Sequence, residues 1–141
     1  LVDAVRSRIS PNKCSADAWL GVMRAAHEQG MNTTATMLFG HIESAAERIA
    51  HLEELRCLQD ETGGFQAFIA LPFQDVATRL HGVRGPGGVD ILKTLAVSRL
   101  FLDNIPHLPE RPTYVEREAH SRGAKNGRPQ SSQSTCPLAR S

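Results

Sequence analysis

The spacing of hydrophobic residues in the middle of the chain changes from that of a β-strand to that of a helix and back again. Residues 32–39 form a short run rich in threonine, methionine, leucine and phenylalanine, a composition typical of strands. Residues 44–62 repeat leucine and isoleucine at helical intervals, which predicts an amphipathic helix. In residues 65–73 both alternating sets are largely apolar, as in a strand that is covered on both faces. This order predicts a β-α-β unit with parallel strands, the repeating unit of α/β proteins.

Local signals place the boundaries of this unit. Ser44 stands where a helix N-cap is expected, and Glu47 at the third helical position completes a capping box. Gly63-Gly64 ends the helix. Pro72 must lie at the end of the second strand, because proline has no N–H to donate to a ladder. The first strand therefore meets the helix at Gly40–Glu43, and ligand sites of parallel α/β barrels lie at such junctions.

Two further helices are predicted on either side of the unit. Ser15 is placed to cap a helix that stops at Gly30. After a glycine-rich loop, residues 74–88, Asp90 is placed to cap a last helix, residues 91–103. That helix is apolar nearly all round, so we expect it to be buried.

The composition is that of one ordinary globular domain. Of the 141 residues 40% are hydrophobic, and the net charge is +1. No apolar run approaches the roughly 20 residues that span a bilayer, and no charged-then-apolar leader is present, so we expect no membrane partner and a cytoplasmic location. Cys14, Cys57 and Cys136 form no CxxC pair and the six histidines are scattered, so no metal site is predicted.

Residues 109–141 differ in character from residues 1–108. They hold six of the sixteen Lys and Arg but three of the fifteen Asp and Glu, among prolines, glycines and serines. With few large apolar side chains, such a segment cannot bury enough surface to offset its ordering entropy, so we expect it to be disordered. Its weak basic charge lacks interleaved aromatic residues, so no nucleic-acid partner is predicted.

Four blocks of the sequence are long and specific: Ala35–Glu43, Leu58–Ile69, Leu92–Leu100 and Leu102–His107. They resemble the radical SAM enzymes of the futalosine route to menaquinone. Within that family, Phe65–Phe68 and Val97–Arg99 are most similar to aminofutalosine synthases, and dehypoxanthine futalosine cyclase is the nearest rival. The resemblance begins near Val5 and stops at His107. We therefore expect 109–141 to be a non-homologous tail, such as a shifted reading frame would produce.

The resemblance implies a fold, a reaction and cofactors. The fold is a TIM-type (β/α) barrel, of which this chain holds only the C-terminal strands and helices. The reaction uses S-adenosylmethionine and a 4Fe-4S cluster to add the adenosyl radical to a small molecule, 3-[(1-carboxyvinyl)oxy]benzoate. The family holds its cluster in a CxxxCxxC loop, which this chain lacks, so we expect the chain alone to be inactive. Whether a companion chain supplies the N-terminal half is left open by the sequence.

The resemblance also points to site residues. Gly40, His41 and Glu43 are predicted to lie on the S-adenosylmethionine side of the parent site, where glycine permits close approach and the helix start offers N–H groups. Gln66 and Gln74 are predicted to face the barrel mouth and to bind a polar substrate. From the residues alone, Gly40 and Glu43 also suit a turn and a helix start, and His41 suits a structural histidine. No catalytic residue is identified.

A non-catalytic function is an alternative for the β-α-β unit by itself. A small self-standing α/β binding module without catalysis would have the same elements. The missing cluster ligands, the absence of an initiator methionine and the abrupt tail argue against this alternative.

Overall fold

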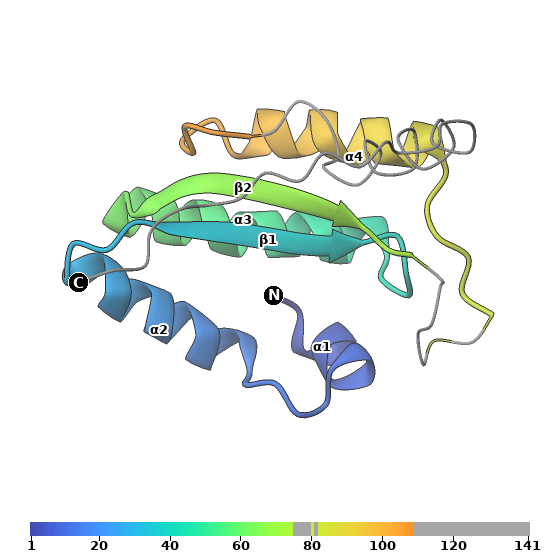
Figure 1. Ribbon diagram of the computed structural model, residues 1–141, viewed down its shortest axis with the longest axis horizontal. Coiled ribbons are helices and arrows are strands. Elements are labelled where there is room, and N and C mark those ends of the chain that lie inside the picture. Colours follow the sequence, from blue (N-terminus) through green and yellow to red (C-terminus); the bar gives the residue numbers. More distant parts are fainter. Residues whose placement is uncertain (75–79, 81, 109–141) are drawn as a thin grey trace, which may run out of the picture.

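The computed structural model describes residues 1–74, 80 and 82–108, so the disorder predicted for 109–141 lies outside the described residues. The elements are, in order, α1 (Asp3–Ile9), α2 (Ala16–Glu28), β1 (Thr33–Phe39), α3 (Ala45–Thr62), β2 (Phe65–Pro72) and α4 (Gly88–Phe101). The predicted β-α-β unit is therefore confirmed as β1-α3-β2. In Figure 1, α3 lies behind both strands, α2 lies on the β1 side and α4 on the β2 side.

The two strands are parallel. Thr33 is opposite Phe65 at one end of the sheet and Phe39 is opposite Pro72 at the other, with one irregularity next to Thr33. Beyond α4, the chain returns to the amino half of β2, where His107 forms a parallel bridge with Ala67. The β-α order thus continues towards a third parallel position, and the fold is α/β, as predicted. A closed barrel is not seen in the described residues.

One face of the sheet forms the core with α3. The side chains buried in that core include Ala35, Met37, Phe39, Phe65, Phe68, Ala70, Leu52, Leu55 and Leu58. The opposite face is open: Thr34, Thr36 and Leu38 point away from the core, and Leu38 is 45% exposed. On that face of β2 the side chains of Ala67, Ile69 and Leu71 are half-buried, so the predicted cover on both faces of the second strand is only partial in the described residues.

The predicted ends of α3 are confirmed by its hydrogen bonds. Ser44 Oγ accepts from the Glu47 N–H, and the Glu47 carboxylate accepts from the Ser44 N–H in return, a complete capping box. Gly63 adopts the left-handed conformation that closes the helix, with φ of 63°. Ser15 caps α2 in the same way as predicted, by accepting from the Ala18 N–H.

Helix α4 corrects two predictions. Its N-cap is Gly87, and Asp90 lies inside the first turn with a different task, described below. The helix is also not buried all round: Leu92 is 67% exposed and Leu100 is 82% exposed. Only the side that carries Thr94 and Ser98 is buried, because α4 packs against α3 and β2 along one face.

Two polar side chains secure the amino end of the sheet. Gln59 reaches from α3 to the Phe65 backbone, where its Oε1 accepts from the N–H at 2.8 Å and its Nε2 donates to the carbonyl at 3.1 Å. His27 bridges the hydroxyl groups of Thr62 and Thr33 at 2.6 and 2.7 Å. The amino end of the sheet is therefore held together by hydrogen bonds from side chains of the chain itself.

Candidate functional site

The turn Gly40–Glu43 lies at the carboxyl end of β1. Gly40 has φ of 82°, a conformation that disfavours any residue with a Cβ. A Cβ on Gly40 would also overlap the ring of Pro86. The close approach that we expected a ligand to make at this glycine is therefore made by a proline of the chain, from the segment that leads into α4.

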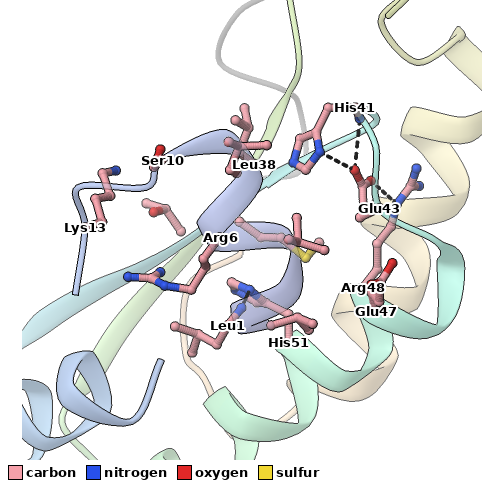
Figure 2. Close-up of a pocket in the computed structure, with 15 residues that line it drawn as sticks. Leu1, Arg6, Ser10, Lys13, Leu38, His41, Glu43, Glu47, Arg48 and His51 are labelled. Carbon is pink, nitrogen blue, oxygen red and sulfur yellow. Dashed lines mark hydrogen bonds and ion pairs between the residues drawn. The ribbon is translucent and has the colours of Figure 1, made fainter. Parts of the chain in front are cut away.

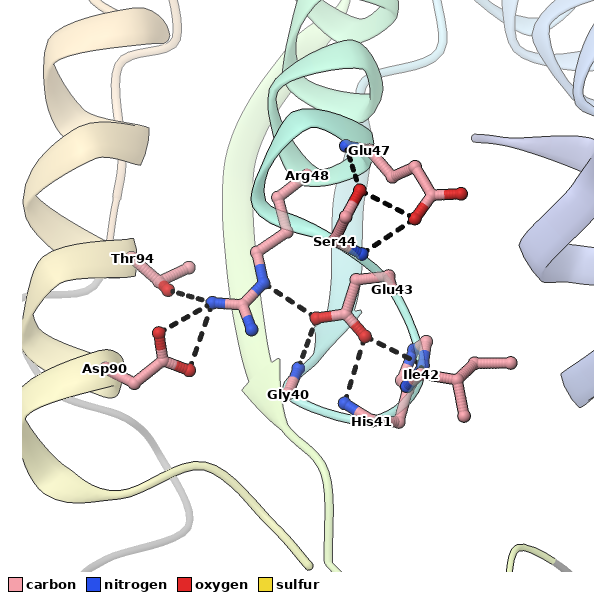
Figure 3. Close-up of polar contacts among 9 residues, drawn as sticks. All are labelled: Gly40, His41, Ile42, Glu43, Ser44, Glu47, Arg48, Asp90 and Thr94. Atoms are coloured by element: carbon pink, nitrogen blue, oxygen red, sulfur yellow. Dashed lines mark hydrogen bonds and ion pairs between the residues drawn. The ribbon is translucent and has the colours of Figure 1, made fainter. Parts of the chain in front are cut away.

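Glu43 folds its carboxylate back onto this turn. Oε1 accepts from the Gly40 N–H at 2.5 Å and from Arg48 Nε at 2.7 Å. Oε2 accepts from the His41 N–H at 2.9 Å and lies 2.8 Å from His41 Nδ1. The Glu43 side chain is only 6% exposed, and Figure 3 shows it at the centre of the turn. Both oxygens already have partners within the chain, so Glu43 serves to hold the turn in shape.

The electrostatics agree with this geometry. Burial by itself works to raise the pKa of Glu43, but hydrogen bonds from the backbone of the turn and from Arg48 outweigh it and lower the pKa. The carboxylate is therefore charged near neutral pH, and its charge is matched by N–H donors that are fixed by the backbone.

His41 is also enclosed, with a side chain that is 1% exposed. Its ring meets Phe73 edge-on at 6.0 Å between ring centroids. Nδ1 has two neighbours: the Ile42 N–H at 2.7 Å and Glu43 Oε2 at 2.8 Å. Without a proton Nδ1 accepts from Ile42, and with a proton it donates to Glu43, so one contact excludes the other. The ring therefore has a structural role in either state.

Arg48 connects the turn to α4. Its side chain is 17% exposed. Besides Glu43, it donates through one terminal nitrogen to Asp90 at 3.0 and 3.1 Å and to the Thr94 hydroxyl at 2.9 Å. The guanidinium also lies over the Phe39 ring, 5.2 Å from its centroid. Figure 3 shows Asp90 and Thr94 facing it from α4.

The N–H groups of the turn are largely consumed by these contacts. The donors of Gly40 and His41 go to Glu43, and those of Ser44 and Glu47 take part in the capping box. Within residues 1–74, 80 and 82–108, no hydrogen bond to the carbonyl oxygens of Gly40, His41 or Ile42 is found. The turn is thus better suited to accept hydrogen bonds from a ligand than to donate them.

A pocket of about 190 Å³ lies beside the turn. It is enclosed by α1, the edge of β1, the turn and the first part of α3, as Figure 2 shows. Its charged and ionisable lining residues are Arg6, Lys13, His41, Glu43, Glu47, Arg48 and His51. Leu38 and Met37 belong to its apolar wall. The pocket thus combines an apolar wall with charged side chains of both signs.

His51 forms the α3 wall of this pocket and provides a test of its burial. Burial, followed by the nearby N-terminal ammonium group, lowers the pKa of His51 to about 3. The ring is neutral in the folded chain, whereas the unfolded chain takes up a proton below about pH 6.5. The free energy of unfolding should therefore fall as pH decreases from about 6.5 towards 3, by about 1.4 kcal/mol per pH unit from this residue.

The measurement is urea unfolding of the chain and of the variant His51→Gln at several pH values. The variant should lack this part of the pH dependence, and the difference between the two proteins should shrink as pH falls. Equal pH dependence in the two proteins would show that His51 is exposed to protonation in the folded state.

The two predicted substrate glutamines lie at opposite ends of β2. Gln74 follows Phe73, whose N–H donates to the Phe39 carbonyl at 2.8 Å, so it lies at the same end as the turn. Gln66 lies at the amino end, where its Nε2 donates to Asn32 Oδ1 at 3.2 Å. The structure therefore brings Gly40, His41 and Glu43 together and leaves Gln74 near them, but it separates Gln66 from them.

The cysteines do not fit a 4Fe-4S cluster. Cys14 precedes α2 and Cys57 lies on α3, and both are exposed. Within the described part of the chain, no group of three or more His, Cys, Asp or Glu side chains could hold a metal ion. No helix in the same part is both long and apolar enough to cross a membrane.

No protein-family model matches the chain. Several individual proteins are nevertheless similar to the chain. Aminodeoxyfutalosine synthase of Thermus thermophilus is 50% identical over 110 residues, which cover 75% of this chain and 30% of that protein. A Halobacterium salinarum enzyme, 5-amino-6-(D-ribitylamino)uracil–L-tyrosine 4-hydroxyphenyl transferase, is 47% identical over 77% of the chain and 25% of its own length. Cyclic dehypoxanthine futalosine synthase of Streptomyces coelicolor is 42% identical over 77% of the chain and 27% of its own length.

These relatives confirm the predicted relationship to the enzymes of the futalosine route. The aminodeoxyfutalosine synthase of Streptomyces coelicolor, at 44% identity, belongs to the same group. The chain spans about 30% of the length of the synthases that it matches. At 47% against 42% identity over this segment, the 4-hydroxyphenyl transferase is more similar to the chain than the cyclic synthase, which we had expected to be the nearest rival.

Proposed function

We propose that this chain forms the C-terminal part of the barrel of an aminodeoxyfutalosine synthase. The observation that carries the proposal is the 50% identity to the Thermus thermophilus enzyme over three quarters of the chain. The parallel strands β1 and β2, with a third parallel position begun at His107, support the barrel. The site then lies at the carboxyl ends of these strands, where the Gly40–Glu43 turn is found.

The whole enzyme would add the adenosyl radical of S-adenosylmethionine to 3-[(1-carboxyvinyl)oxy]benzoate. The cluster that cleaves S-adenosylmethionine requires three closely spaced cysteines, and Cys14, Cys57 and Cys136 do not fit it. This chain therefore contributes part of the wall of the site, and by itself it is inactive. A companion chain or a longer form of the protein would supply the cluster.

Within that site, the turn is proposed to lie against S-adenosylmethionine. The carbonyls of Gly40, His41 and Ile42 are suited to accept from its amino groups, since the N–H groups of the turn are already in use. Glu43 acts as a positioning residue that fixes these carbonyls, and Gln74 lies at the same end of the sheet. Gln66, at the far end, has no part in this arrangement.

The test is a chimera in which residues 1–108 replace the matching segment of the Thermus thermophilus enzyme. After anaerobic assembly of the cluster, we expect the chimera to produce 5′-deoxyadenosine and aminodeoxyfutalosine. Glu43→Ala in the chimera should weaken S-adenosylmethionine binding, because the turn carbonyls that Glu43 fixes are no longer held in one position.

The matched control is Glu53→Ala, which removes an exposed carboxylate from α3, the helix that follows the turn. It should leave binding unchanged. Equal binding by the Glu43→Ala chimera and the unchanged chimera, with both folded, would show that the turn does not contribute to the cofactor site.

The cyclic synthase and the 4-hydroxyphenyl transferase are the alternatives, because this segment is 42% and 47% identical to them. The same segment can be placed in each of those two enzymes. Full activity in the synthase alone would favour the first proposal, and equal activity in all three would show that specificity lies outside residues 1–108.

A further inference from the structure

The start of α4 touches the turn by two independent routes. Along the first, Asp90 and Thr94 bind one terminal nitrogen of Arg48, and the Nε of the same guanidinium donates to Glu43 Oε1. That oxygen is also the acceptor for the Gly40 N–H. A displacement of Asp90 would therefore be passed through one rigid guanidinium to the backbone of Gly40.

The second route is a direct contact. Pro86, two residues before the start of α4, packs where a Cβ of Gly40 would lie. The two routes reach the turn through the same residue, Gly40, from different atoms. Because Gly40 is the most flexible residue of the turn by chemistry, contacts on both its Cα and its N–H limit the conformations open to it.

The burial of the partners suggests what the contacts are for. Glu43 and Arg48 are enclosed, at 6% and 17% side-chain exposure, but Asp90 is 45% exposed. An ion pair to so exposed a carboxylate contributes about 1 kcal/mol or less to stability. The main consequence of these contacts is for geometry. The two Asp90 oxygens and the Thr94 hydroxyl together fix the orientation of the Arg48 guanidinium.

We infer that residues Pro86–Thr94 are a positioning element for the Gly40–Glu43 turn, with Arg48 as the connection between them. The inference rests on the proposed function for its consequence, the affinity for S-adenosylmethionine. Asp90, Thr94 and Arg48 are positioning residues in this account: they touch neither cofactor nor substrate, and they act through Glu43.

The first experiment uses the 141-residue chain itself and needs no ligand. In the double variant Asp90→Asn, Thr94→Val, amide hydrogen exchange of Gly40 and His41 should quicken by about tenfold or more, because their acceptor is no longer fixed. Exchange of Phe68, in the core of β2, should stay the same. The control variant Glu61→Gln breaks the exposed ion pair with Arg24 at 2.6 Å and should change neither.

The second experiment places the same double variant in the chimera described above. The KM for S-adenosylmethionine should rise about three- to tenfold with little change in kcat, and Asp90→Glu should restore most of the affinity. Glu61→Gln should leave both constants unchanged. A merely structural role would instead lower the amount of folded enzyme without moving KM.

The outcomes separate this inference from the proposed function. Unchanged exchange at Gly40 and His41 would overturn the inference, whatever the chimera does. Faster exchange with an unchanged KM would also overturn it, while a chimera that still forms 5′-deoxyadenosine would keep the proposed function. A chimera that forms none would overturn the proposed function, and the exchange measurement would still decide whether α4 positions the turn.

Discussion

Replacing Gly40 with alanine is expected to destabilise the chain by about 2–5 kcal/mol. About 1–2 kcal/mol arises because φ of 82° is unfavourable for a residue with a Cβ. A further 1–3 kcal/mol arises because the new methyl group overlaps the Pro86 ring, and either the turn or the segment before α4 must move. Urea unfolding, followed by circular dichroism, measures the sum.

A second glycine separates the two contributions. Gly30 has φ of 75° and nothing within 4 Å of the position of its missing Cβ, so Gly30→Ala should show the conformational cost alone. In the Gly40→Ala chain, Pro86→Ala should recover part of the loss, because it removes most of the ring. If Gly30→Ala and Gly40→Ala are equally destabilising, the contact between Pro86 and the turn is not tight.

Arg48→Met is expected to destabilise the chain by about 3–5 kcal/mol. The substitution keeps much of the length of the side chain over Phe39 but leaves the Glu43 carboxylate enclosed without its cation. Removing one member of an enclosed ion pair costs more than the pair contributes, because the remaining charge has lost its access to water. The free energy of unfolding near neutral pH is the quantity to compare.

The matched control is Arg24→Met. Arg24 and Glu61 form a bidentate pair with a shortest distance of 2.6 Å, but their side chains are 41% and 50% exposed, so its loss should cost about 1 kcal/mol or less. The double variant Glu43→Gln, Arg48→Met should be more stable than Arg48→Met, since no enclosed charge is left without a partner and the exposed Asp90 carboxylate is solvated. Similar losses for the two arginine variants would mean that Arg48 is as well solvated as Arg24.

The sequence was sufficient for α2, β1, α3, β2 and α4 and for their order, whereas the short helix α1 was not predicted. The strand β1, the helix α3 and the strand β2 were predicted close to their observed bounds. Their signals are local: the Ser44–Glu47 capping box, the glycine at position 63 and the period of the hydrophobic residues act within one or two turns of chain. The α/β class and the junction at Gly40–Glu43 follow directly from that order.

The local signals failed where a side chain has its partner far along the chain. Asp90 has the residue type and position of an N-cap, yet Gly87 takes that place and Asp90 binds Arg48, 42 residues earlier. The apolar surface of α4 was read as a buried helix, although Leu92 and Leu100 lie on its open side. Periodicity tells that a face is apolar, but only the packing partners decide which face is covered.

The sequence by itself determined the backbone of the candidate site, and the tertiary structure decided what its residues do. Gly40, His41 and Glu43 were found from their place between a strand and a helix, but their roles depend on Pro86 and Arg48. Gln66 and Gln74 were grouped by their strand, but the extended strand holds them at opposite ends, and the pairing with β1 shows that Gln74 is at the end beside the turn. The physical reason is that backbone conformation depends on neighbours in sequence, whereas hydrogen-bond partners and burial depend on which segments the pairing of β1 with β2 brings together.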